Sequence, residues 1–81
     1  MDDSKLIAFT EVVGRMAYSV RDAWYIGEFT ESDEEQLTSE INGLVRRLGL
    51  SPDQAKEAYN LLDPVARDIL DSCTAEWLFE E

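Results

Sequence analysis

The apolar residues of this chain recur at intervals of three and four positions, which is the spacing of one face of an α-helix. No stretch alternates apolar and polar residues as a half-buried strand does. The clearest line lies between residues 4 and 26 and consists of Leu6, Phe9, Val13, Met16, Ala17, Val20 and Trp24. Because every core-forming segment has the helical spacing, the sequence predicts an all-α protein.

Start and stop signals divide the chain into four helices. Gly27 and Gly49 are placed to end the first two helices in the left-handed conformation. Pro52 and Pro64 suit the first position of the last two, and Ser51 before Pro52 is a cap. We therefore expect a small bundle with helices over about 4–26, 32–48, 52–62 and 64–79, in a single domain of residues 1–81.

A second line on the first helix places that helix in the centre of the bundle. It consists of Ile7, Gly14, Tyr18 and Tyr25, and two apolar lines suggest a helix covered on more than one side. Gly14 costs about 1 kcal/mol relative to Ala in a helix interior, so we expect a close approach of another element there.

The last helix carries more apolar residues than one core can accept. Its inward positions are Ala66, Ile69, Leu70, Cys73 and Trp77. Leu78 and Phe79 then point away from that face. Either the chain end frays and folds its aromatics back over the bundle, or Leu78 and Phe79 form an exposed apolar spot. In the second case the surrounding acids are Asp68, Asp71, Glu76, Glu80 and Glu81.

Charge is the strongest indication of what the protein binds. Eighteen acidic residues against seven basic ones give a net charge of −11, which repels nucleic acid and anionic membranes and favours basic partners. One cluster of five acids lies between residues 28 and 35: Glu28, Glu31, Asp33, Glu34 and Glu35. Part of this run starts the second helix, where Thr30 or Ser32 is the candidate cap and acids favour the positive helix end.

The residues that most enzymes need are missing. The chain has no His and a single cysteine, Cys73, which falls on the apolar face of the last helix. No Gly-rich phosphate loop or calcium-binding loop is present. We expect no catalytic activity, cofactor or metal, and the lone cysteine and the absence of a signal or membrane-spanning segment point to the cytoplasm.

The segment VRRLGLSPDQAKEAYNLL at residues 45–62 resembles a helix-turn-helix of bacterial transcription regulators. The likeness rests on the capped turn of residues 48–51, on Ala55 and on the apolar positions that follow, about a quarter of the chain. It implies a second helix that enters the major groove. The matching positions are Pro52, Asp53, Gln54, Lys56 and Glu57. With one lysine and two acids among them, direct DNA binding is not expected.

The leading hypothesis is a small acidic protein that modulates another protein through carboxylates around an apolar centre. Its most concrete form is an inhibitor that occupies a nucleic-acid-binding surface, similar in size, charge and helicity to DNA mimics, phage anti-CRISPR proteins and nuclease immunity proteins. The candidate contact residues are Glu28, Glu31, Asp33, Glu34, Glu35, Asp68, Asp71, Leu78 and Phe79. The alternatives are a helix-turn-helix regulator or its degenerate partner, and a homodimeric adaptor joined through the Ile7–Tyr25 line or the last aromatics.

Overall fold

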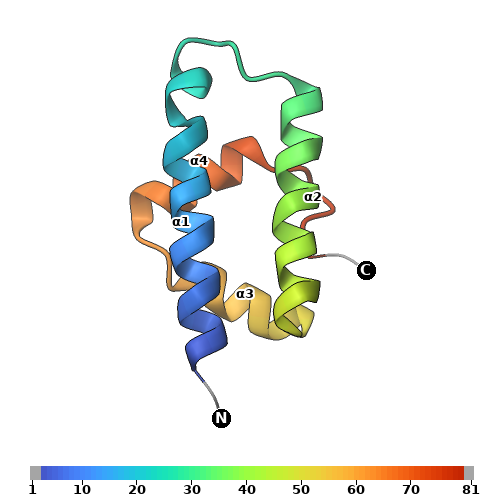
Figure 1. Ribbon diagram of the computed structural model, residues 1–81. Helices are drawn as coiled ribbons and strands as arrows, with labels where there is room; N and C mark the ends of the chain where they lie inside the picture. Colours follow the sequence, from blue (N-terminus) through green and yellow to red (C-terminus); the bar gives the residue numbers. More distant parts are fainter. Residues whose placement is uncertain (1–2, 80–81) are drawn as a thin grey trace.

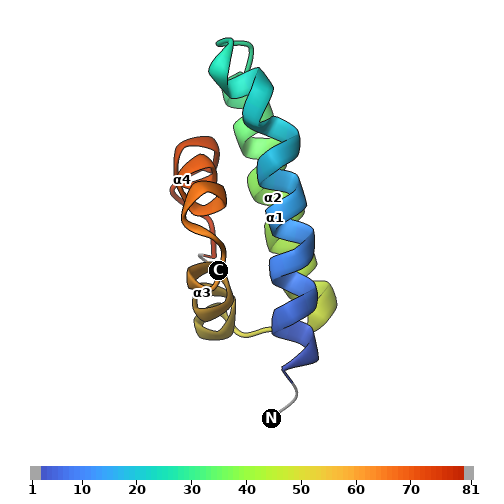
Figure 2. The ribbon, with the colours of Figure 1, turned by 90° about the vertical axis from the view of Figure 1, so that its left-hand side faces the viewer.

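The computed structural model describes residues 3–79 and contains four helices. They are α1 (Ser4–Tyr25), α2 (Glu31–Leu48), α3 (Pro52–Asn60) and α4 (Pro64–Cys73) (Figure 1). No strand occurs in the described chain, so the all-α prediction is confirmed. Long helices α1 and α2 form an antiparallel pair, and the shorter α3 and α4 lie together against one face of that pair (Figure 2). The molecule measures 41 × 24 × 16 Å.

Helix α1 is central, as expected, because it packs against each of the other three helices. The reason differs from the one the sequence suggested. Residues of the first apolar line make these contacts, and Phe9, Val13 and Ala17 are fully buried. The second line does not face the core, since Ile7 and Tyr25 remain 57% and 65% exposed.

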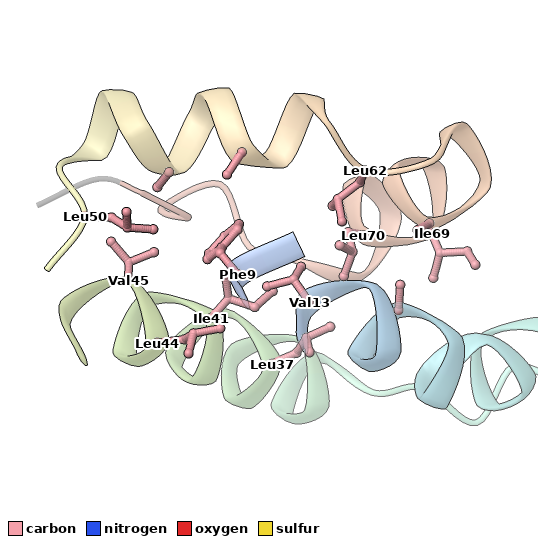
Figure 3. Packing of buried hydrophobic residues seen from close by; sticks show 14 of the residues in the cluster. Phe9, Val13, Leu37, Ile41, Leu44, Val45, Leu50, Leu62, Ile69 and Leu70 are labelled. Atoms are coloured by element: carbon pink, nitrogen blue, oxygen red, sulfur yellow. The ribbon is translucent and has the colours of Figure 1, made fainter. Parts of the chain in front are cut away.

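The core fills the space between the two layers (Figure 3). Phe9 and Val13 of α1 meet Ile41 of α2, while Leu62 and Leu70 close the side of α3 and α4. Small residues at the inward positions of the short helices, Ala55, Ala58 and Ala66, are fully buried. These small side chains allow α3 and α4 to lie close to α1.

Glycines end both long helices as expected. Gly27 and Gly49 have φ values of 76° and 70°, the left-handed conformation that glycine adopts without a steric penalty. In each case the next amide donates back to a carbonyl five residues earlier, from Glu28 to Ala23 at 2.9 Å and from Leu50 to Val45 at 3.0 Å. This pattern satisfies carbonyls that the helix end leaves without a partner.

Capping boxes begin α2 and α3. At α2 the cap is Thr30, not Ser32, because Asp33 N donates to Thr30 Oγ1 and Thr30 N donates to the Asp33 carboxylate at 3.1 Å. Helix α2 therefore starts at Glu31, one residue before the expected start at 32. At α3 the expected cap Ser51 is confirmed, and it forms both reciprocal bonds of a capping box with Gln54.

The end of α4 is the largest departure from expectation. The helix stops at Cys73, not at residue 79, because Thr74 takes an extended conformation. Residues 74–79, the C-terminal segment, then return over α2. Trp77, predicted to be buried, is 39% exposed as a result. Smaller differences occur at the other ends: α1 ends at Tyr25 and α3 at Asn60.

Two buried polar side chains of α2 fix the path of the C-terminal segment. Thr38 Oγ1 accepts from Ala75 N at 2.7 Å and donates to Glu34 O within the helix. One turn further along, Asn42 Oδ1 accepts from Phe79 N at 3.0 Å. These bonds give the returning backbone the partners that it lost when the helix ended.

The expected close approach at Gly14 is not observed. A Cβ atom at this position would lie 3.9 Å from Leu62 Cδ2, an ordinary contact distance. The isolated chain therefore has room for alanine at residue 14.

Gly43, in the interior of α2, gives a first prediction. Apart from its chain neighbours and the backbone of its own helix, no atom lies within 4 Å of the place its Cβ would occupy. Gly43→Ala should raise the free energy of unfolding by about 0.5–1 kcal/mol, since alanine loses less backbone entropy in a helix. Urea denaturation followed by circular dichroism measures this. Gly49→Ala is the matched control and should destabilise the protein, because φ is positive there.

Thr38→Val tests the attachment of the C-terminal segment. Valine keeps the shape of threonine but cannot accept the bond from Ala75 N, so we expect a loss of about 1–3 kcal/mol in the free energy of unfolding. Thr10→Val is the matched control, because Thr10 Oγ1 bonds only to Ile7 O in its own helix. Equal stability of the two variants would show that the Thr38 bond does not hold the segment.

Candidate protein-binding groove

The C-terminal segment, α3 and α4 together form an open groove with a volume of about 450 Å³. We call it the C-terminal groove. Its apolar lining comes from Tyr59, Leu78 and Phe79, and its charged lining from Asp71, Glu76 and Lys56. Carboxylates around half-buried apolar groups are the composition of a protein interface more than of a small-molecule site.

Phe79 is held firmly at one side of the groove. Its ring lies 6.2 Å from the Phe9 ring and 5.7 Å from the Tyr59 ring, which it meets edge to face. Its φ of 64° is unfavourable for a residue with a side chain. The bond from its amide to Asn42 and these ring contacts hold the residue in that conformation. Phe79 is thus half-buried, a wall of the groove that the fold places there.

Asp71 is fixed by a hydrogen bond across the groove. Tyr59 Oη donates to Asp71 Oδ1 at 2.6 Å. Burial, then this bond and the negative charge of Asp71, raise the pKa of the Tyr59 phenol well above its usual range. The phenol therefore stays protonated, and the exposed carboxylate keeps acceptor capacity for a cation on a partner.

Three of the predicted contact residues, Asp71, Leu78 and Phe79, come together in this groove. Asp68 lies exposed on α4 one turn before Asp71, and its charge also raises the pKa of Tyr59. The acidic lining of the groove thus consists of Asp71 and Glu76, and Asp68 lies outside it on the same helix as Asp71. Lys56 provides the opposite charge at the α3 side of the groove.

The five acids of residues 28–35 surround the start of α2 and do not line the C-terminal groove. Glu28 precedes the helix, and Glu31, Asp33 and Glu35 are exposed on it. Successive helical residues point about 100° apart, so these side chains diverge. Asp33 takes part in the capping box. Glu34 is half-buried near the end of α4, where its charge adds to burial in raising the pKa of the Cys73 thiol.

Several residues of the site were not predicted. Sequence analysis gave no role to Tyr59, Thr38 or Asn42. A signal for the last two exists in the sequence. They lie four residues apart among the apolar positions of α2, where a polar side chain needs a buried partner. The partner itself is distant in the chain and could not be identified.

The helix-turn-helix segment does form two helices joined by a tight turn, α2 and α3. Of the positions that the resemblance assigns to base contacts, Pro52, Asp53, Lys56 and Glu57 are exposed. Gln54 instead uses its side-chain oxygen to accept from Ser51 N at 2.9 Å. Among these positions the only base that could contact DNA is Lys56, and it lies between the acids Asp53 and Glu57.

Other kinds of site find little support in the described chain. Residues 3–79 contain no group of three or more His, Cys, Asp or Glu side chains arranged to hold a metal ion. Cys73 is a fully buried free thiol whose pKa is raised by burial, which disfavours a nucleophilic role. None of the four helices has the length and apolar composition needed to cross a membrane.

Comparison of the chain with protein-family models, with curated proteins and with solved structures finds no match.

The raised pKa of Tyr59 predicts how stability changes at alkaline pH. Below about pH 10 the phenol is protonated in both the folded and the unfolded state. Above it the unfolded chain loses this proton while the folded protein keeps it, so the free energy of unfolding falls as pH rises. Tyr59→Phe should show a shallower fall above about pH 10. Urea denaturation at several pH values measures this, and parallel curves for the two proteins would contradict it.

Proposed function

We propose that this protein is an acidic binding protein that modulates a basic partner protein through the C-terminal groove. The observation that carries the proposal is the exposed Asp71 carboxylate, fixed at 2.6 Å by Tyr59 beside the apolar surface of Leu78 and Phe79. A fixed carboxylate loses little conformational entropy on binding a cation. The adjoining apolar groups add affinity by leaving water.

The partner class that fits this surface is a protein with a basic, nucleic-acid-binding surface. A net charge of −11 attracts such a surface from a distance and accelerates association. An arginine of the partner matches the groove best, because its guanidinium pairs with a carboxylate and its flat face stacks on aromatic rings. The carboxylates then occupy sites that would otherwise hold phosphates, so the expected outcome is inhibition of nucleic-acid binding.

The acids at the start of α2 are a second contact region in this proposal. Their divergent directions suit long-range attraction better than one compact contact. We place the protein in the cytoplasm, where its single buried thiol would remain reduced and where nucleic-acid-binding partners are found.

Charge-neutralising variants test the groove. The basic partner is first captured from the host cytoplasm with the wild-type protein. The double variant Asp71→Asn with Glu76→Gln should bind this partner with an affinity lower by about tenfold, or about 1.4 kcal/mol. The matched control is Asp53→Asn with Glu57→Gln, which changes the net charge equally on exposed positions of α3. Affinities are measured by surface plasmon resonance on the captured protein, with duplex DNA as competitor.

Two outcomes would contradict the proposal. Equal affinity of the groove and control variants would remove the groove from the contact. Failure of duplex DNA to compete would exclude a nucleic-acid-binding surface as the target.

A third variant, with Gln in place of Glu28, Glu31 and Glu35, keeps the Asp33 cap and measures the contribution of the start of α2 separately.

A further inference from the structure

The exposed side of α1 carries six residues in the spacing of a coiled-coil seam. They follow one another at intervals of four, three, four, three and four: Ile7, Glu11, Gly14, Tyr18, Arg21 and Tyr25. This alternation is that of the a and d positions of a heptad, which face a partner helix. We call this line the α1 seam. At a rise of about 1.5 Å per residue it is about 27 Å long, nearly the whole helix.

No other helix covers the seam in the described chain, and only the turn between α3 and α4 touches it, with Leu62 near the half-buried Gly14 and Asp63 at Tyr18. Ile7, Tyr18 and Tyr25 are 57%, 45% and 65% exposed, and Glu11 and Arg21 are exposed as well. Figure 2 looks onto the side of α1 that faces away from α2, and no helix lies in front of α1 there. Three large apolar side chains, exposed in one line along nearly the whole helix, make the seam a candidate interface.

The two aromatic side chains of the seam, Tyr18 and Tyr25, are held in place within the single chain. Tyr18 Oη donates to the Asp63 carboxylate at 3.1 Å, and the Arg21 guanidinium lies 5.7 Å above the Tyr25 ring. Asp63 is flanked by Leu61 and Val65, which are 65% and 51% exposed. The exposed apolar area therefore extends from the seam onto the turn between α3 and α4.

The seam of one copy is complementary to the seam of a second copy that runs in the opposite direction. When two copies of α1 run antiparallel about a point near residue 16, Ile7 meets Tyr25 of the second copy. Glu11 then meets Arg21, an acid opposite a base, and Gly14 meets Tyr18, the smallest residue opposite a large ring. Each pairing occurs twice by symmetry, as a two-fold interface requires.

We propose that the protein forms an antiparallel homodimer through the α1 seam. The pairing accounts for Gly14, which nothing in the single chain requires, since a Cβ there would meet only Leu62 at 3.9 Å. In the dimer a glycine leaves room for the tyrosine ring of the second copy. A parallel arrangement would instead place Glu11 against Glu11 and Arg21 against Arg21, which repel each other.

Charge reversal tests the pairing of Glu11 with Arg21. Residues 11 and 21 lie about 15 Å apart along one helix, so they do not pair within a chain. Sedimentation equilibrium at about 0.15 M salt, where the Debye length is about 8 Å, screens the net charge of the two copies. The wild type should dimerise, Glu11→Arg should dimerise about tenfold more weakly, and Glu11→Arg with Arg21→Glu should recover the wild-type constant. Glu57→Arg, an equal charge change on α3, is the control.

A disulfide experiment tests the direction of the helices. Apart from the introduced thiols the only cysteine is the buried Cys73. A mixture of Ile7→Cys and Tyr25→Cys chains should form the mixed disulfide under mild oxidation, while either variant alone should form little homodisulfide. Dominant homodisulfides would overturn the antiparallel register.

A wild type that remains monomeric at millimolar concentration, or a double reversal that does not restore dimerisation, would overturn the dimer. Neither result bears on the proposed function, because the seam and the C-terminal groove share no residue. Affinity of the groove variants for a basic partner is measured on a different surface.

Discussion

The hydrogen bonds that Thr38 and Asn42 accept from the backbone amides of Ala75 and Phe79 are the constraint on which the functional surface of this protein depends. An α-helix that stops at Cys73 leaves a backbone that needs partners beside a hydrophobic core, where an unpaired polar group is costly. Two side chains one turn apart on α2 supply those partners. The segment can then bring Phe79 against Phe9 and Tyr59, and the groove exists because this ring stands beside α3.

The same constraint explains why buried polar residues occur in so small a core. A domain of 81 residues buries a modest share of its surface and has a narrow margin of stability. Thr38 and Asn42 replace apolar contacts that the core would otherwise gain. Their hydrogen bonds, however, restrict the chain end to one path. Apolar side chains at the same positions would not do so, because the hydrophobic effect has no direction. The structure thus combines a general apolar core with a few directional bonds.

The acidic residues are distributed according to what each location allows. At the start of α2 they favour the positive end of the helix, and Asp33 completes a cap. At the groove, Asp71 is oriented by a phenol that remains protonated. The α1 seam carries one acid, Glu11, and one base, Arg21, among apolar side chains. A surface with both charges suits a second copy of the chain better than a basic partner. The two proposed surfaces therefore differ in charge as well as in position.

The sequence by itself determined the four helices, most of their ends and nearly all of the core. These features follow from interactions within about five residues: apolar spacing, the cap that Ser51 forms at the start of α3, and the left-handed glycines 27 and 49. Tertiary structure alone decided the end of α4, the exposure of Trp77, the bond between Tyr59 and Asp71 and hence the groove. The physical reason is separation in the chain. The bonds that fix the C-terminal segment join residues 37 positions apart. Local spacing predicts a continuing helix there, and only the folded core offers the returning chain a competing set of partners.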